Sequence, residues 1–355
     1  MKNETHLDEK KARSKPLAAH LRRLYELESR IHGLNPWKWL APPDIFAIQR
    51  EGYEPLFVCF NKTMTGFDTV DIGLGWRSYP VLLHVHTHKV HYPAFYFENR
   101  MFQFGRLDAD RLFAVETENH AKHGLPQSGG RVPFFRSHQV GFAPWPVNRA
   151  EALFLADVMY IVFGMAMRVE DFREPLGSRA MEEVYMMPVD AEGQLGEPSW
   201  VPLPAIPNDL QADVDLTGGL LQRVKDLPAG DSAMEIDHVF LPYFPGKHSA
   251  SQAPQTGYLF ILAIPRGNHR AELVYFTLHA NHDVSNVWSK LPVHILEVIA
   301  SQSTRPPEIQ VTDSRLLALL RPLTEMFPLR LTRAVKLPII ENECPELLKK
   351  LGVKS

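Results

Sequence analysis

The strongest constraint on the fold is a run of alternating patterns in the C-terminal third of the chain. Two apolar strands around a tight turn at Arg266-Gly267-Asn268 are followed by helix, strand, helix and strand, expected at residues 258–264, 272–278, 284–301, 308–311, 314–327 and 329–334. A strand–helix–strand passage of this length favours a right-handed parallel crossover beside an antiparallel pair. The pattern therefore predicts an α/β domain with a mixed sheet, preceded by a helix near 216–225 and a strand near 236–243.

This order of elements resembles the ribonuclease H-like core of integrases and transposases. Such nucleases hold two metal ions with acidic residues, one on the first strand and one at the end of the strand after the first helix. Asp313 matches the second position, and Glu297 is the one plausible carboxylate nearby, but the strand at 258–264, taken as the first, carries no acid. The resemblance therefore implies a degenerate, non-cleaving version. Asp313 is also placed to cap the helix that begins at Ser314.

The N-terminal half has a different pattern, with short β-branched and aromatic runs separated by glycines. Strands are expected at residues 45–49, 56–60, 70–74 and 81–90, after an amphipathic helix carrying Leu21, Leu24 and Ile31 that ends near Gly33. Another helix is expected at 108–122. This half is predicted to be an antiparallel meander packed with helices, so the whole chain belongs to the α+β class.

The most hydrophobic segment, residues 152–167, predicts a buried central helix. Asn148 and Glu151 have the spacing of a capping box at its start. The apolar run is shorter than the roughly 20 residues that span a bilayer, and it contains Asp157. We therefore expect no membrane association.

A chain of 355 residues predicts two domains. Residues 1–15 are highly charged and are expected to form a disordered tail. The proline-rich stretch 168–209 predicts a connector with an entry strand at 184–189. The expected domains are residues 16–175 and 176–355.

Charge and motifs exclude several function classes. A net charge of −3 gives no global basic field, so a nucleic-acid or protein partner would need a local patch. Cys59 and Cys344 form no disulfide framework, which favours a reducing cytoplasm. No nucleophile elbow, Walker loop or dinucleotide fingerprint is present.

One segment concentrates imidazoles. His84, His86 and His88 recur with a period of two and would share one face of the strand expected at 81–90. Imidazole suits Zn²⁺ and related metals, with His91 or a distant residue completing the shell. On a strand, however, His84 and His88 lie about 13 Å apart, too far to share an ion easily. The alternative is an ordinary solvent-facing polar edge.

A second resemblance rests on residues 133–145, Pro-Phe-Phe-Arg-Ser-His-Gln-Val-Gly-Phe-Ala-Pro-Trp, together with Pro36-Trp37 and the ending Pro306 to Val311 and Leu337-Pro338. These features look like a bacterial family of two-domain proteins of unknown function. The resemblance implies the domain layout and no substrate. Within it, Arg136 and Trp145 are candidate interaction residues, and Arg136 is expected to pair with a partner or with a buried carboxylate such as Asp157.

Another polar stretch, His279 to Asp283, is interpreted as a turn with Asp283 capping the next helix rather than as a hydrolytic site. Together these patterns predict a non-catalytic cytoplasmic binding or scaffold protein without a cofactor. The alternatives are a metal-dependent hydrolase that uses the histidines of 84–91 with Zn²⁺ or another divalent ion, or a degenerate ribonuclease H-like nucleic-acid-binding protein. The oligomeric state is not predicted.

Overall fold

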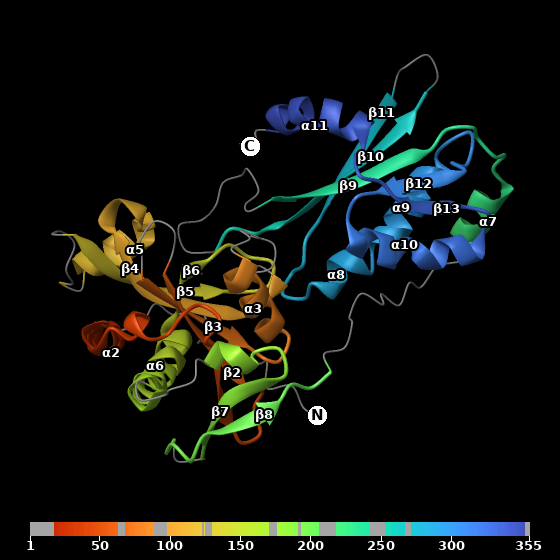
Figure 1. Cartoon of the computed structure of the whole chain (residues 1–355). Coiled ribbons are helices and arrows are strands. Elements are labelled where there is room, and N and C mark those ends of the chain that lie inside the picture. The colour runs from red at the N-terminus through yellow and green to blue at the C-terminus, as the bar shows by residue number, and fades with distance from the viewer. Residues whose placement is uncertain are drawn as a thin grey trace. The chain divides into compact units, whose positions relative to one another are not determined.

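The computed structural model describes residues 18–62, 68–88, 98–122, 124, 130–169, 176–190, 193–205, 218–241, 253–266 and 271–351 (Figure 1). The chain divides into two compact units, which are described separately. The predicted tail at 1–15 and the histidine His91 lie outside the described residues.

The first unit contains an eight-stranded, mostly antiparallel sheet in the order β6-β5-β4-β3-β2-β1-β7-β8. Its strands are β1 (Phe46–Arg50), β2 (Leu56–Lys62), β3 (Asp68–Leu74), β4 (Met101–Asp108), β5 (Arg131–His138), β6 (Trp145–Pro146), β7 (Glu183–Val189) and β8 (Ser199–Pro202). The first three strands of the predicted meander are confirmed. β7 is parallel to β1, and the other neighbours are antiparallel.

The fourth predicted strand is wrong, because residues 81–88 belong to helix α3 (Ser78–His88). Tyr79 and Leu82 are buried three residues apart and pack with the cluster around Phe57 and Met101, a spacing that only a helix allows. The position beside β3 is taken instead by β4. The alternating histidines predicted a strand, but burial of Tyr79 and Leu82 on one face favours the helix.

Two helices cover the opposite face of this sheet and lie side by side (Figure 1). They are α2 (Ala18–Leu34), which confirms the predicted amphipathic helix, and α6 (Arg149–Val169). The capping box of α6 is present: Asn148 N–H donates to Glu151 Oε2 at 2.9 Å, and Glu151 N–H donates to Asn148 Oδ1 at 3.0 Å. Between helices and sheet lies the largest apolar cluster, with Leu24, Phe60 and Met159 fully buried.

Among the described residues, α6 is the one helix that is long and apolar enough to cross a membrane, and half of its most apolar stretch is buried inside the protein.

A shorter helix than expected, α5 (Ala114–Lys122), follows the 3-10 turn Ala109–Arg111; other 3-10 turns lie at Pro36–Lys38 and Leu176–Arg179.

The first compact unit also includes β7 and β8, because β7 pairs with β1 and β8 pairs with β7. The domain bounds 16–175 and 176–355 stay a prediction. The short segment Val140–Ala143 belongs to the second unit, where its backbone bonds to Pro254, Thr256 and His282. Whether each unit folds as an independent domain stays a prediction.

The second unit contains a five-stranded mixed sheet in the order β11-β10-β9-β12-β13. Its strands are β9 (Met234–Leu241), β10 (Gly257–Pro265), β11 (Ala271–Leu278), β12 (Glu308–Val311) and β13 (Arg330–Arg333). β9, β10 and β11 are antiparallel neighbours, whereas β9, β12 and β13 run parallel. Its helices are α7 (Gly218–Asp226), α8 (Ser285–Trp288), α9 (Leu291–Ala300), α10 (Ser314–Met326) and α11 (Pro338–Lys350). The α+β class and the mixed C-terminal sheet are confirmed.

Candidate functional site

The second unit brings polar residues together where the carboxyl end of β12 lies beside the middle of its parallel neighbour β9. The first strand of this sheet is β9, which carries Glu235 and Asp237, so the prediction of a first strand without an acid is wrong. The error came from starting the sheet at β10. Val311 pairs with Ile236, so Thr312 and Asp313, which follow β12, lie beside Asp237 and His238.

The carboxylate of Asp313 is engaged by donors from its own chain. Its Oδ1 accepts from the Arg315 N–H at 2.6 Å, which confirms the predicted cap of α10. Its Oδ2 lies 3.6 Å from Arg315 Nε and 3.6 Å from His238 Nε2. A cap bond and a nearby guanidinium are what a helix start normally uses to satisfy such a group.

Asp237 has a less favourable environment. Burial raises its pKa, and the Asp313 and Glu341 carboxylates add to this, against hydrogen bonds from the His238 amide and the Thr312 side chain. The His238 amide bond to Asp237 Oδ1 measures 2.8 Å. Glu235, two residues earlier, accepts from the backbone of Ile339 and Ile340 at the start of α11, which is a structural role.

His238 is enclosed by aromatic rings. The ring centroids of Tyr258, Phe260 and Trp288 lie 5.4 to 5.9 Å from its own. Burial lowers the pKa of His238 to about 4. The Asp313 carboxylate opposes this shift, and the positive charge of Arg315 adds to it. The imidazole is therefore neutral at pH 7. Arg315 also lies over the Trp288 ring, 4.9 Å from its centroid, which fixes its guanidinium.

These residues do not fit the two-metal site that the ribonuclease H-like resemblance implies. In the part of the chain that the structure describes, no group of three or more His, Cys, Asp or Glu side chains is arranged to hold a metal ion. Glu297, expected near Asp313, pairs with His294 at 3.0 Å. Near the end of β12, Arg333 donates to the Thr312 carbonyl at 3.2 Å and Lys336 is exposed, while the exposed Glu341 of α11 adds a negative charge.

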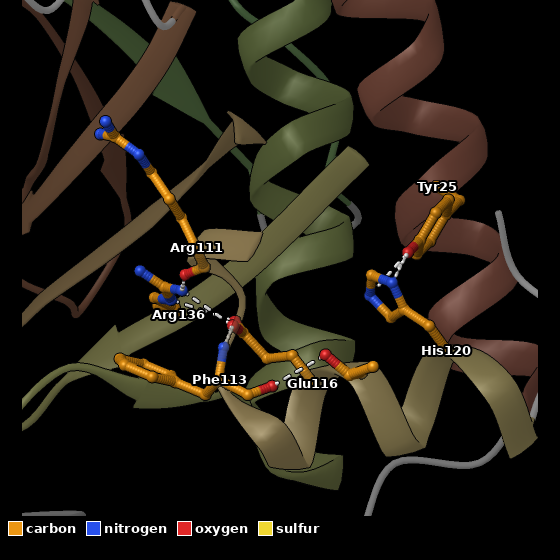
Figure 2. A network of polar contacts seen from close by, with 7 residues as sticks. Tyr25, Arg111, Phe113, Glu116, His120 and Arg136 are labelled. Atoms are coloured by element: carbon orange, nitrogen blue, oxygen red, sulfur yellow. Dashed lines mark hydrogen bonds and ion pairs between the residues drawn. The ribbon is translucent and has the colours of Figure 1, made fainter. Parts of the chain in front are cut away.

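In the first unit, Figure 2 shows Arg136 beside Glu116 of α5, and Phe113 contacts both Arg136 and Trp145. Arg136 donates to Glu116 Oε1 at 3.0 Å and Oε2 at 2.8 Å, and to the Arg111 carbonyl at 3.2 Å. Its guanidinium lies 4.1 Å from the centroid of the Phe113 ring. The Phe113 ring also stacks with Trp145, with 5.7 Å between the ring centroids. Arg136 therefore pairs with a buried carboxylate, as one of the two expectations had it, but that carboxylate is Glu116; Asp157, named as the example, bonds to Arg23.

The same region buries a phenol–imidazole pair. Figure 2 shows the Tyr25 hydroxyl of α2 directed at His120 of α5, 2.7 Å from Nε2. Burial, with the carboxylates of Glu28 and Glu116, raises the pKa of Tyr25 above its ordinary value. The phenol therefore stays protonated, and the pair ties the two helices together. An ion pair ties α2 to β4 as well: Arg106 Nε lies 2.8 Å from Glu28 Oε1.

A row of polar residues crosses the sheet on the face that α3 covers, and no sequence pattern predicted it. Cys59, Asp71, Gln103 and Arg136 are successive register partners on β2 to β5. Gln103 Nε2 donates to Asp71 Oδ1 at 2.8 Å, and the Cys59 thiol donates to the Pro42 carbonyl at 3.1 Å. Burial raises the Cys59 pKa, so the group is a thiol and not a nucleophilic thiolate.

One comparison with known proteins gives a match over this unit. Residues 22–187 match a family described as Domain of unknown function (DUF7309). The DUF7309 match runs from α2 into β7, so it covers the helices and most strands of the first unit. No curated protein and no solved structure matches the chain. The function of the matched domain is unknown, and the ribonuclease H-like similarity and a bacterial origin stay predictions.

The remaining predicted residues have separate positions. His84 is exposed on α3, and the side chains of His86 and His88 lie outside the described ones. Because residues 78–88 form a helix and not a strand, the objection based on strand spacing no longer holds. Asp283 accepts from the Ser285 N–H at 2.9 Å, which confirms its capping role.

Proposed function

We propose that the protein is a non-catalytic binding protein whose second unit binds nucleic acid without cleaving it. The proposed contact surface consists of Arg333, the last residue of β13, and Lys336, which follows β13. A scaffold role toward a protein partner is the alternative outcome. We also expect a cytoplasmic location, which agrees with the two free cysteines Cys59 and Cys344.

The observation that carries the proposal is that the Asp313 carboxylate already interacts with the first turn of helix α10. A carboxylate that caps α10 and lies against Arg315 is a poor ligand for a second cation, because binding would displace both partners. His238, beside it, is neutral and enclosed by aromatic rings. The donor set therefore supports binding over metal-assisted hydrolysis.

The position of the basic residues supports an anionic ligand. β9 and β12 are adjacent parallel strands, but the chain continues from β9 to β10 on one side and from β12 to β13 on the other side. Open α/β sheets bind ligands beyond the carboxyl ends of strands at such a topological switch point. Arg333 ends β13, the parallel neighbour of β12, and Lys336 follows it. Exposed arginine and lysine at such a point suit phosphate oxygens of a nucleic-acid backbone.

Binding is tested with the full-length protein and labelled single- and double-stranded DNA and RNA, by fluorescence anisotropy at several salt concentrations. We expect affinity to fall steeply with salt, and Lys336→Gln to reduce the slope of log K against log salt by about 1. Lys349→Gln, the same change on α11, is the matched control and should leave the slope unchanged. Absence of binding to all four probes, or equal effects of the two variants, would refute the proposal and leave a protein partner.

Cleavage is tested on the same probes with Mg²⁺ or Mn²⁺, and none is expected. Metal-activated cleavage abolished by Asp313→Asn would replace the proposal with nuclease action. Metal analysis of the purified protein should give substoichiometric Zn, Ni, Mn and Fe. A stoichiometric metal lost in His84→Ala and retained in His86→Ala would instead establish a metal site on α3, since only residues one turn apart share a helix face.

A further inference from the structure

The second unit buries a cation for which the described chain supplies no counter-charge. Arg305 keeps 9% of its surface, and it is the one arginine or lysine among the buried residues that the structure describes. Its side chain makes no ion pair or hydrogen bond to any described residue. The buried carboxylates, in contrast, all have donors: Glu28, Glu116 and Glu151 pair with arginines, Asp44 and Glu235 accept from backbone amides, Asp71 accepts from Gln103, and Glu308 accepts from Thr332 and Arg330.

The backbone fixes the position of Arg305. Its N–H donates to the Pro228 carbonyl at 2.8 Å, and its carbonyl accepts from the Gly230 N–H at 2.8 Å. The guanidinium lies over the Phe327 ring, with 5.9 Å from Cζ to the ring centroid, which is near the outer limit of a cation–π contact. This aromatic contact supplies only a weak attraction for the buried charge.

An unpaired guanidinium is unfavourable in such a place. Arginine does not give up its proton in proteins, and a buried charge without a partner costs more free energy than a buried polar group. Nε is enclosed without a hydrogen-bond partner, whereas Nη1 and Nη2, which bond to no described residue, are not enclosed. Water that reaches Nη1 and Nη2 can hydrate them but brings no negative charge. An anion at the same place brings it.

We propose that Arg305 binds a phosphate group through Nη1 and Nη2, either inorganic phosphate or the terminal phosphate of a small molecule. The planar guanidinium matches two oxygens of an oxyanion, and a phosphate group carries about two negative charges at pH 7. Because so little of Arg305 is exposed, a group at the end of a molecule can reach it, whereas an internal phosphodiester, which continues on both sides, cannot.

This site lies away from the proposed nucleic-acid surface. Arg305 precedes β12 and therefore lies at the amino end of the parallel strands, whereas Arg333 ends β13 at their carboxyl end. The phosphate site does not depend on the proposed nucleic-acid binding, and either can fail without the other.

Titration of the full-length protein with inorganic phosphate tests the site, by calorimetry at a constant ionic strength set with NaCl. We expect one phosphate per chain, and Arg305→Met to weaken its binding about tenfold or more. Arg22→Met, the same change at an exposed arginine of α2, is the matched control and should leave the affinity unchanged. Absence of phosphate binding, equal affinity in Arg305→Met, or tighter binding of acetate than of phosphate would overturn the proposal.

Glycerol 3-phosphate, titrated in the same way, distinguishes the two sources of the phosphate group. Binding that Arg305→Met weakens would show that the site takes a terminal phosphate. Binding of inorganic phosphate alone would show a site for the free ion. Both results support the site.

Thermal unfolding gives a second measurement. In phosphate-free buffer, Arg305→Met should unfold at the wild-type temperature or above it, because the substitution removes a buried charge that lacks a partner. Added phosphate should raise the unfolding temperature of the wild type more than that of Arg305→Met, since a ligand of the native state stabilises it and the general effect of the salt acts on both.

The opposite result would contradict the proposal: an Arg305→Met variant that is less stable without phosphate and gains as much from phosphate as the wild type. If Arg305→Met does not fold, Arg305→Lys takes its place, because it keeps the charge and loses the two-nitrogen contact. Arg305→Lys should bind phosphate more weakly than the wild type, and equal affinity would overturn the proposed contact.

Discussion

At the scale of single residues, the first unit is notable for carboxylates that are almost fully buried and each held by an arginine. Glu28 is paired with Arg106 and Glu116 with Arg136, and the two glutamates have side-chain exposures of 2% and 4%. A buried ion pair is weak evidence for net stability, since desolvation offsets the attraction. Its value here is positional: the pairs fix α2 and α5 on the sheet.

Removing one charge from such a pair should be costly. We expect Glu116→Gln to lower the free energy of unfolding by about 3 kcal/mol, because the Arg136 guanidinium keeps its burial and loses its counter-charge. Glu183→Gln, which breaks the exposed Arg179–Glu183 pair, should cost less than about 1 kcal/mol. Urea unfolding of both variants checks this, and similar losses would show that Arg136 finds another partner.

At the scale of elements, the contact of α3 with the sheet depends on a glycine of β3. An added Cβ on Gly73 would lie 2.4 Å from Ser78 Oγ and 2.5 Å from Ser78 Cβ. Ser78 is fully buried, and its hydroxyl donates to the Gly75 carbonyl at 2.8 Å. The first turn of α3 therefore rests directly on the β3 backbone.

Opposite effects are expected from alanine at two glycines. Gly73→Ala should destabilise the protein by about 1–3 kcal/mol, because Ser78 has no room to move away. Gly33→Ala lies in α2, where an added Cβ meets no atom within 4 Å, and should stabilise it by up to about 1 kcal/mol. Thermal unfolding distinguishes them; a neutral Gly73→Ala would mean that α3 does not rest on β3.

At the scale of the whole molecule, each unit buries a neutral histidine. Burial lowers the pKa of His138 in the first unit to about 4; Asp71 opposes this shift, and Arg136 and Arg100 add to it. Burial likewise lowers the pKa of His238 in the second unit to about 4. In the unfolded chain both take up a proton near pH 6.5. Between pH 6.5 and 4 the unfolded state therefore binds more protons, and stability falls as the pH falls.

Each histidine should contribute separately to this acid sensitivity. His138→Gln is expected to reduce the pH dependence of the unfolding free energy between pH 4 and 6.5 by about 1.4 kcal/mol per pH unit. His294→Gln, at an exposed histidine, is the control and should leave the slope unchanged. Urea unfolding at several pH values measures the slope. An unaltered slope in His138→Gln would mean that this ring is protonated in the folded protein.

The sequence by itself determined the features that depend on neighbours a few positions away. The capping box Asn148–Glu151, the Asp313 cap, the β10–β11 hairpin and the helical spacing of α2 are satisfied by residues within one or two turns. These local patterns were sufficient to predict the α+β class and the mixed sheet of the second unit.

Features that depend on competition for burial could be seen only in the folded protein. Residues 81–88 had an alternating pattern, but the core around Phe57 favoured helix α3. Arg136 had several carboxylates available, and the docking of α5 selected Glu116. Asp237 became part of the candidate site because β12 pairs with β9, a pairing between strands distant in sequence. Such choices are made by long-range packing, which no local spacing encodes.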